Sequence, residues 1–283
     1  YLGKRNIYTF TGTDPTVDEN DLTATVNQFI RTNSALHYDN TNSVPGLLGI
    51  GTEIANTTDR THREDAIIDY IHGYEYVEGV SSASKAQRSW LFGDILHSRP
   101  VVYNYSAYTS TSEDLCAEDV SPGSPFNSSV IYVGANDGML HAFRDCDGRE
   151  MWGFVPPQIL PHLKEATDGS HQYFVDSAPV AYVHDINNNG VIEEASGDRV
   201  VLVFGLRRGG GSNDVNFTGA QGGYFAIDVS IPETPKLLFS VDSKTTKNGI
   251  DYPFKEMGQS WSQPRLTKVK DGAAIKVVAF VTG

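Results

Sequence analysis

From Trp90 to the end of the chain, short apolar runs alternate with clusters of Gly, Asn, Asp and Pro. Short runs that are bounded by turn-forming residues are typical of β-strands. When the runs are stacked, they align as three units of one internal repeat. The first unit contains 98–103, 130–134, 138–143 and 150–154; the second contains 177–182, 199–205, 223–228 and 236–239; the third contains 262–266 and 277–283.

Each complete unit predicts four short strands joined by tight turns, which is the plan of one blade of a β-propeller. A blade cannot bury both of its faces alone, so neighbouring blades must pack on each other. Propellers typically carry four to eight blades, whereas two units and part of a third are visible. We therefore expect a mainly β fold, a modified and partial β-propeller of about two and a half blades over 91–283, with the chain stopping inside the third blade.

Residues 1–90 form a lead-in segment that is mixed and partly helical, with long polar stretches of little periodicity. One helix is predicted over about 61–73. Thr61 and Glu64 have the spacing of a capping box, and apolar residues then recur at three- and four-residue intervals. Gly73 is placed to end this helix.

A run of oxygen-bearing side chains, 185–193, lies in the turn between the first two strands of the second unit. Its alternate positions hold five candidate metal ligands: Asp185, Asn187, Asn189, the Val191 carbonyl and Glu193. These are positions 1, 3, 5, 7 and 9 of an EF-hand-like calcium loop, and Gly190 stands at position 6, where the chain must turn sharply. Ile192 at position 8 can anchor the loop to the core. The sequence therefore predicts a Ca²⁺ site.

The loop departs from a full EF-hand at position 12, where Ser196 replaces the bidentate glutamate. Coordination must then be completed by Glu194, Asp198 or water. With Asp185 and Glu193 as the two certain carboxylates, we expect weak binding, with a Kd of roughly 0.1 to 1 mM. The alternative is a solvated Asn/Gly hairpin that binds no metal.

The overall charge excludes several classes of partner. The chain has 283 residues, 22 Lys and Arg against 35 Asp and Glu, and a net charge of −13. A strongly acidic chain without a basic run is not expected to bind nucleic acid or an anionic membrane surface. No stretch approaches the length of about 20 apolar residues that a membrane span requires. The absence of a signal-peptide pattern at Tyr1 suggests that the numbering starts inside a longer, processed precursor.

The two cysteines, Cys116 and Cys146, are too few for a zinc–thiolate site. Cys116 lies in the insertion of the first unit and Cys146 in the turn Asp145-Cys146-Asp147-Gly148. A disulfide between them would close a loop of about 30 residues and stabilise the fold by roughly 3 to 4 kcal/mol. The alternative is a pair of reduced thiols in a cytosolic protein.

Five segments resemble the PilY/PilC family of type IV pilus tip adhesins. They are RNIYTF at 5–10, FGDILHSRPVV at 92–102, YVGANDGMLHAF at 132–143, GLRRGG at 205–210 and GGYFAID at 222–228. Together they span nearly the whole chain and match the C-terminal region of the family. The GANDGMLHAF portion alone also resembles quinoprotein propellers.

The resemblance to the PilY/PilC family implies a non-enzymatic protein outside the cell, at the tip of a pilus (fimbrium). It implies association with minor pilins, a role in pilus assembly and retraction, and adhesion to a host-cell or abiotic surface ligand. It also implies a calcium site on the propeller, which maps onto the five ligands given above. The family pattern often has aspartate where this chain has Asn189 and Glu193, which lowers the negative charge of this loop.

The alternative function is a quinone-dependent dehydrogenase of the quinoprotein propeller type. Such an enzyme needs a cofactor at the propeller centre, with cation ligands and a catalytic carboxylate beside it. Asp137 and Asp176 are the candidate carboxylates, although turn and strand-end roles explain both more simply. A hydrolase is less well supported, because Ser260 and Ser262 have no histidine partner at a recognisable spacing.

Overall fold

We describe the protein from a computed structural model. It describes residues 5–16, 18–43, 45–51, 53–105, 129–209, 222–242, 246–247, 250–251, 254, 257–272 and 274–282.

The first predicted unit is an antiparallel sheet. Its strands are β2 (Val101–Asn104), β3 (Ser129–Gly134), β4 (Leu140–Arg144) and β5 (Glu150–Phe154). A further strand, β1 (Ile7–Tyr8), joins the sheet through parallel pairing with β5. The turn between β3 and β4 contains Gly138 with φ of 104°, a left-handed conformation that favours glycine.

The second predicted unit is a four-stranded antiparallel sheet in chain order. Its strands are β6 (Val180–His184), β7 (Arg199–Gly205), β8 (Gly223–Asp228) and β9 (Lys236–Asp242). The pairing of β8 with β9 shifts register between Ala226 and Ile227, and the pairing of β4 with β5 shifts between Ala142 and Phe143. Gly134 pairs with Leu140 in the first sheet and Gly205 with Tyr224 in the second. Each shift begins two residues after these pairs, so the two sheets share a β-bulge at the same place.

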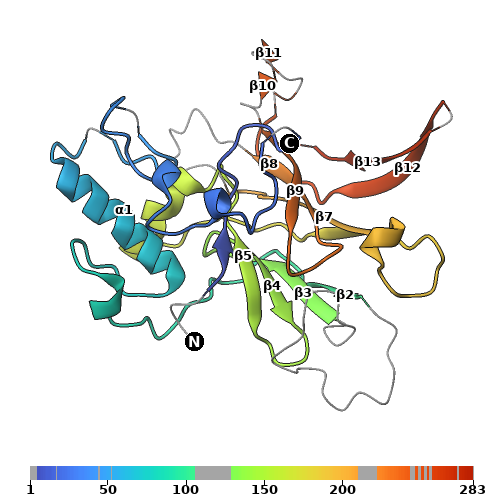
Figure 1. Ribbon diagram of the computed structural model, residues 1–283, viewed down its shortest axis with the longest axis horizontal. Coiled ribbons are helices and arrows are strands. Elements are labelled where there is room, and N and C mark those ends of the chain that lie inside the picture. Colours follow the sequence, from blue (N-terminus) through green and yellow to red (C-terminus); the bar gives the residue numbers. More distant parts are fainter. Residues whose placement is uncertain are drawn as a thin grey trace.

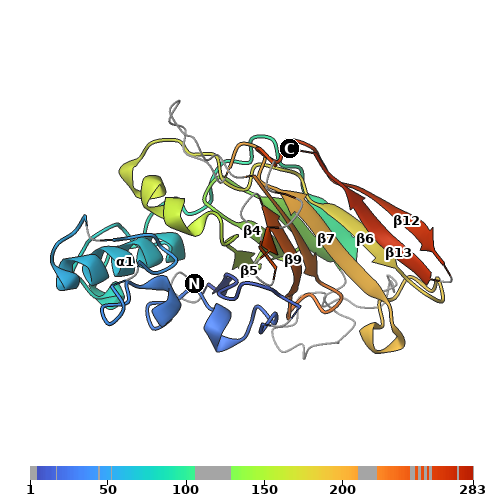
Figure 2. The same ribbon diagram turned by 90° about the horizontal axis from the view of Figure 1, so that it is seen from above.

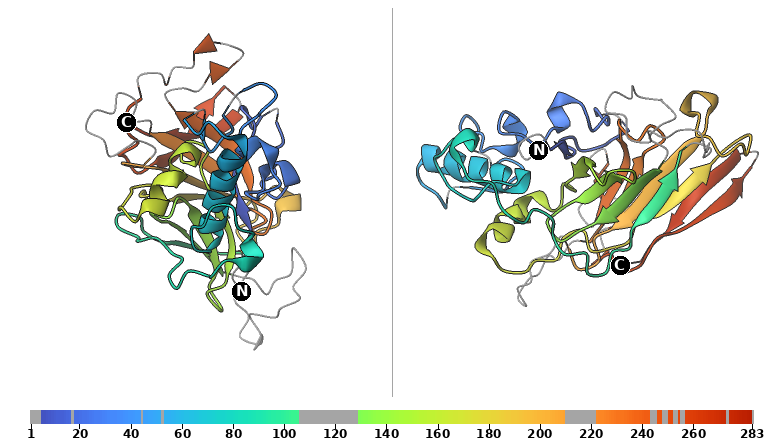
Figure 3. Two further views of the ribbon diagram at one scale, coloured as in Figure 1. Left: turned by 90° about the vertical axis from the view of Figure 1, so that its left-hand side faces the viewer. Right: turned by 90° about the horizontal axis from the view of Figure 1, so that it is seen from below.

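The third unit is represented by the hairpin β12 (Arg265–Asp271) and β13 (Ala274–Phe280), and a small separate hairpin joins β10 (Thr246–Lys247) to β11 (Ile250–Asp251). The sheets lie side by side, with β12 and β13 at the end of the row farthest from α1 (Figures 1 and 2). Figure 3 shows the same row from below, without closure into a ring. The predicted mainly β, partial propeller is confirmed.

The predicted helix is α1 (Thr57–His72), which begins four residues earlier than expected. Its N-cap is Asn56, whose side-chain oxygen accepts a hydrogen bond from the Thr58 amide at 2.9 Å. Thr61 lies inside the helix, and Glu64 accepts a hydrogen bond from the Tyr38 amide at 2.9 Å instead of capping. The predicted capping box is therefore wrong. Gly73 ends the helix in a left-handed conformation, as expected.

The other described helices are short 3₁₀ segments. They are η1 (Thr25–Asn27), η2 (Ser34–Leu36), η3 (Ser82–Ser84), η4 (Leu160–Asp168) and η5 (Glu194–Ser196). None of the helices in the described ranges combines the length and apolar character needed to cross a membrane.

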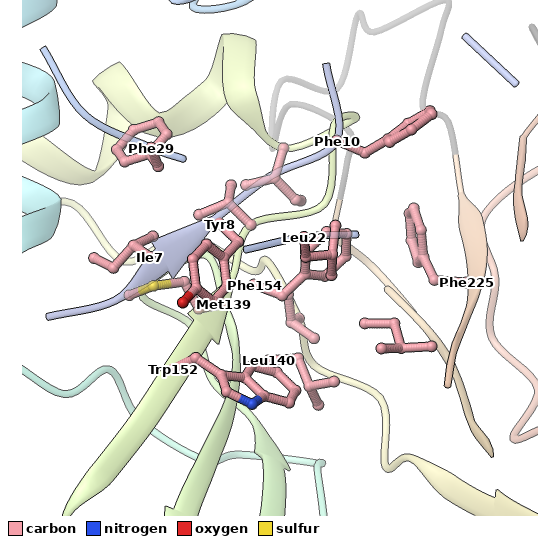
Figure 4. Close-up of a cluster of buried hydrophobic side chains, with 14 of the residues drawn as sticks. Ile7, Tyr8, Phe10, Leu22, Phe29, Met139, Leu140, Trp152, Phe154 and Phe225 are labelled. Atoms are coloured by element: carbon pink, nitrogen blue, oxygen red, sulfur yellow. The ribbon is translucent and has the colours of Figure 1, made fainter. Parts of the chain in front are cut away.

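One hydrophobic cluster runs from β1 through the sheets of the first and the second unit (Figure 4). The Phe154 ring lies edge-on to the rings of Phe204 and Phe225, at centroid distances of 6.5 and 6.3 Å, and so joins the first sheet to the second. Ile7 of the lead-in segment is 2% exposed and belongs to the same cluster. The lead-in segment and the blades therefore share a core, and the proposed boundary near residue 90 stays a prediction.

Candidate calcium site

The run 185–193 follows β6 directly and returns to β7, so it elaborates the first turn of the second blade, as predicted. Three side-chain oxygens shape it by accepting backbone hydrogen bonds. Asp185 Oδ2 accepts from the Gly190 amide at 2.9 Å, Asn187 Oδ1 from Asn189 at 3.0 Å, and Asn189 Oδ1 from Val191 at 2.8 Å. Asx side chains stabilise local turns in this way.

The turn brings Glu193 back to the start of the loop. Asn187 Nδ2 lies 3.4 Å from Glu193 Oε2. Gly190 has φ of 76°, and a Cβ built there would meet nothing within 4 Å, so glycine is favoured by backbone conformation and not by crowding. The predicted ligand positions therefore lie around one tight turn.

One atom of this turn is unsatisfied. Asp185 Oδ1 is buried and has no hydrogen-bond partner among the residues that the structure describes. A buried carboxylate oxygen without a partner is unfavourable, and a bound cation would satisfy it. The available donors are all oxygen, which suits Ca²⁺. Within the described ranges, no group of three or more His, Cys, Asp and Glu is arranged to hold a metal ion, so the loop depends on amide and carbonyl oxygens beside its two carboxylates.

Asp198 closes the loop in a way that the sequence did not reveal. Its side chain is fully buried, and its two oxygens accept hydrogen bonds from the amides of Ile186 at 2.9 Å and Glu193 at 3.0 Å. The hydrogen bond from Ile186, followed by that from Glu193, lowers the pKa of Asp198. Asp198 thus clamps both ends of the loop. Because both oxygens of Asp198 already accept backbone hydrogen bonds, Glu194 and water are the better candidates to complete the coordination of a cation.

The loop also rests on the first blade. Ile192 packs against the hydrophobic core, as expected, and its amide donates to the Tyr105 carbonyl at 2.9 Å, just beyond β2. Burial, together with the charges of Asp185 and Asp198, raises the pKa of Tyr103. The loop of one blade therefore contacts the first strand of the other. Neither tyrosine carried a sequence signal for this role.

The predicted cysteine pair is described at one end. Cys146 lies in the turn between β4 and β5 and is disulfide-bonded. Cys116 falls outside the described residues, so the pairing of Cys116 with Cys146 stays a prediction.

The candidate catalytic residues of the alternative functions have other partners. Asp137 accepts hydrogen bonds from His141 at 3.0 Å and from the Gly93 amide at 3.0 Å. Ser260 Oγ is buried and accepts from the Leu206 amide at 2.9 Å. Ser262 Oγ accepts from the Thr282 amide at 2.7 Å. These contacts give Asp137 and both serines roles in holding turns and strand ends.

Asp137 belongs to a buried charge network that joins the lead-in segment to the first blade. His141 is fully buried between Asp137 and Glu150, with its Nδ1 2.7 Å from Glu150 Oε1. Glu150 also accepts two hydrogen bonds from Arg5, at 2.6 and 2.7 Å. Arg5 in turn donates to the Ile71 carbonyl at the end of α1, at 2.7 Å. The network was not predicted, because its members lie far apart in sequence.

The electrostatics of this network follow from its alternating charges. Burial would lower the pKa of His141, but the carboxylates of Asp137 and Glu150 outweigh burial and raise it to about 9. Burial would likewise raise the pKa of Glu150, but Arg5 and His141 hold it at about 2. His141 is therefore a buried imidazolium at neutral pH.

We expect the free energy of unfolding to fall as the pH rises from about 6.5 through 9. The folded pKa of His141 lies above the ordinary value of 6.5, so its stabilising effect is complete below pH 6.5 and is lost through pH 9. The expected loss is on the order of 3 kcal/mol, measured by urea unfolding at pH 6.5, 8 and 9.5. A His184→Gln variant should keep this dependence. Equal stability of the wild-type chain at all three values would contradict the prediction.

Comparison with known proteins gives a consistent picture. A family profile described as the PilY1 beta-propeller domain matches residues 92–282. The type IV pilus biogenesis factor PilY1 of Pseudomonas aeruginosa (strain UCBPP-PA14) is 28% identical over 274 residues, which are 90% of this chain and 21% of the relative. A PilY1 homolog of Xylella fastidiosa (strain Temecula1) is 31% identical over 217 residues, 72% of this chain and 15% of the relative.

The chain thus spans about a fifth or less of the length of these relatives. No solved structure matches it.

Proposed function

The chain belongs to the PilY1 β-propeller family, and on this premise we propose that it is the calcium-binding propeller portion of a type IV pilus biogenesis factor and adhesin. The biogenesis role is supported by the names of the relatives, which are type IV pilus biogenesis factors. The calcium and adhesin roles go further than those names.

The observation that carries the calcium proposal is the unsatisfied Asp185 Oδ1, buried in a loop whose neighbouring positions present further oxygens. Asp185, Asn187, Asn189, the Val191 carbonyl and Glu193 would hold the ion, and Glu194 or water would complete its shell. Calcium, when bound, supplies a positive charge that relieves the mutual repulsion of Asp185 and Glu193.

The contacts of the loop determine which parts of the protein an ordered loop would affect. The Asp198 carboxylate accepts hydrogen bonds from backbone amides at both ends of the loop. The Ile192 amide donates a hydrogen bond to the Tyr105 carbonyl, just beyond the first strand of the first blade. A loop ordered by calcium would thus stiffen the contact between two blades, and not open a pair of helices as in sensor EF-hands. Strands flank the site on both sides, which favours this mechanism.

The proposal places the protein outside the cell at the pilus tip. There it would associate with minor pilins and present a surface to a host-cell or abiotic ligand. Calcium is available to weak sites in the extracellular medium, where modules with a Kd of about 0.1 to 1 mM are common. The acidic chain, with its net charge of −13, suits a cation-rich exterior.

Replacing Asp185 by alanine in the complete protein, in the organism that encodes it, should remove the calcium dependence of piliation. The measurement is the number of sheared surface pili per cell, at micromolar and at millimolar calcium. Asn188→Gly is the matched control, because Asn188 lies inside the loop with φ of 54° but at a position that supplies no predicted ligand.

Three outcomes are informative for the proposed function. Loss of the calcium response in Asp185→Ala, with a normal response in Asn188→Gly, would support it. Unchanged piliation after deletion of the whole gene would overturn the biogenesis role. Adhesion per pilus, measured on the same cells, tests the adhesin role separately, and an unchanged value in the deletion strain would overturn that role.

A further inference from the structure

The repeat places three different residues at the same position of the three units. Each unit begins with a serine and has a proline two residues later: Ser98 and Pro100, Ser177 and Pro179, Ser262 and Pro264. The residues immediately before these serines are His97, Asp176 and Trp261. They precede the first strand of each unit, β2, β6 and β12. A repeated position is expected to recur at one end of the row of blades.

The structure links these three residues through Arg207. Asp176 is buried and accepts hydrogen bonds from the His97 amide at 3.1 Å and from His97 Nδ1 at 2.7 Å. Arg207 Nε lies 3.7 Å from Asp176 Oδ2, and the Arg207 guanidinium lies 5.3 Å from the centre of the Trp261 ring. One residue from each unit therefore contributes to a continuous cluster.

Arg207 is held in an unusual conformation at the end of β7. Its φ is 54°, in the left-handed region of backbone conformation that residues other than Gly, Asn and Asp rarely adopt. Its amide donates to the Ser260 carbonyl at 3.1 Å, and its Nε is buried without a hydrogen-bond partner in the described part of the chain. Non-glycine residues in such conformations concentrate at functional sites.

Arg208 extends the cluster with a second stacked cation. Its guanidinium lies 5.0 Å from the centre of the Tyr173 ring, and the side chain is exposed. Beyond Tyr173, His171 pairs with Asp94 at 3.0 Å. The next residue, Gly209, packs so closely that a Cβ there would lie 1.7 Å from the Phe174 carbonyl oxygen, which fixes the two arginines against the segment that leads to Asp176.

The chemistry of this cluster favours a small anion. Arg207 pairs with the buried Asp176, whereas Arg208 makes no ion pair with the described residues and lies over the Tyr173 ring. The described part of the cluster therefore offers a positive charge in a chain whose net charge is −13. A guanidinium stacked on an aromatic ring keeps its N–H edge available, and that edge matches a carboxylate in bidentate geometry. Phosphate-rich polymers are disfavoured by the overall charge.

We propose that this end of the blades binds a small carboxylate-bearing molecule. The site is formed by His97, Tyr173, Asp176, Arg207, Arg208 and Trp261. The exposed guanidinium of Arg208 holds the carboxylate, and Arg207, paired with Asp176, adds a second positive charge beside it. Asp176 and His97 position Arg207, and Trp261, which is 52% exposed, offers a ring to the rest of the ligand. The carboxylate belongs either to a simple organic acid or to an acidic sugar, and the two sources are separated by experiment.

The test is an NMR titration of the full chain in which the tryptophan indole N–H signals are followed. The probes are acetate, glucuronate and, as the uncharged match, glucose. The Trp261 signal is assigned with a Trp261→Phe variant, and the signal of the buried Trp152 serves as the internal reference. We expect glucuronate to shift the Trp261 signal saturably, and Arg208→Gln to weaken binding at least tenfold. Arg63→Gln on α1 is the matched control and should bind as the wild type.

The probes also identify the source of the carboxylate. Tighter binding of glucuronate than of acetate assigns an acidic sugar, and equal binding assigns a simple organic acid. A response to glucose equal to that of glucuronate would overturn the proposal, because recognition would then not involve the carboxylate. Unweakened binding by Arg208→Gln, or no saturable shift with either acid, would overturn it as well. Arg208 is exposed, so its replacement is not expected to prevent folding.

Discussion

Replacing Glu150 with glutamine is expected to lower the free energy of unfolding by about 3 to 5 kcal/mol. Glutamine keeps the size of the side chain but removes the charge that Arg5 and His141 share. The Arg5 side chain is 9% exposed and that of His141 is 0% exposed, so both cations would stay buried with less compensation. Breaking one member of a buried charge network is unfavourable for this reason.

Urea unfolding of Glu150→Gln against the wild type, at pH 7 and constant salt, measures this effect. Glu78→Gln is the matched control, because Glu78 pairs with Arg63 at 3.5 Å with both side chains more than 40% exposed, and such surface pairs contribute at most about 1 kcal/mol. Arg5→Lys should fall between the two, since lysine keeps the charge but not the bidentate geometry. Equal stability of Glu150→Gln and Glu78→Gln would contradict a structural role for the network.

The network also explains why the lead-in segment is bound to the first blade. Strand β1 contributes only two residues, Ile7 and Tyr8, to its pairing with β5. Arg5, just before it, adds a bidentate contact to Glu150 at the start of β5 and a hydrogen bond to the end of α1. Short strands are weak alone, so this charge contact and the shared hydrophobic core together hold the segment in place.

The blades could be predicted from the sequence because their signals are local. The apolar runs, their turn residues and the repeated order all lie within single units. The bulge that both sheets share near Ala142 and Ala226 was seen only in the strand pairing. By contrast, β1 pairs with a strand about half the chain away, and no local pattern announces such a partner. The start of α1 was missed because the sequence offers two residues that could cap the helix, Asn56 and Thr61, and the structure uses Asn56. Glu64 does not complete a capping box, since its carboxylate accepts a hydrogen bond from the Tyr38 amide.

The candidate site divides in the same way. Their spacing is enough to predict that Asp185, Asn187 and Asn189 lie around one turn. Each side chain accepts a hydrogen bond from a backbone amide only two to five residues further along the chain. The role of Asp198 depends on the path of the loop back to β7, and the contact with Tyr105 depends on how two blades pack. Neither is encoded in a short motif, so both required the structure.

The second large expected effect concerns calcium itself. Asp185→Ala should abolish saturable calcium binding, because Asp185 carries a buried carboxylate oxygen that has no hydrogen-bond partner among the described residues. Asn188→Gly should bind as the wild type. Asn189→Asp should bind several-fold more tightly, since a further carboxylate raises the affinity of a calcium loop. Ser196 stands at the position of the closing bidentate glutamate, so we expect the wild-type loop to bind weakly, with a Kd of about 0.1 to 1 mM.

Isothermal titration of calcium into the wild-type chain, Asp185→Ala, Asn188→Gly and Asn189→Asp is the most direct test of a calcium loop on the second blade. Circular dichroism of each variant first establishes that it is folded. We predict saturable heats for the wild type and Asn188→Gly, tighter binding for Asn189→Asp, and no saturable heat for Asp185→Ala. Identical calcium heats from the wild type and from folded Asp185→Ala would contradict the proposed site.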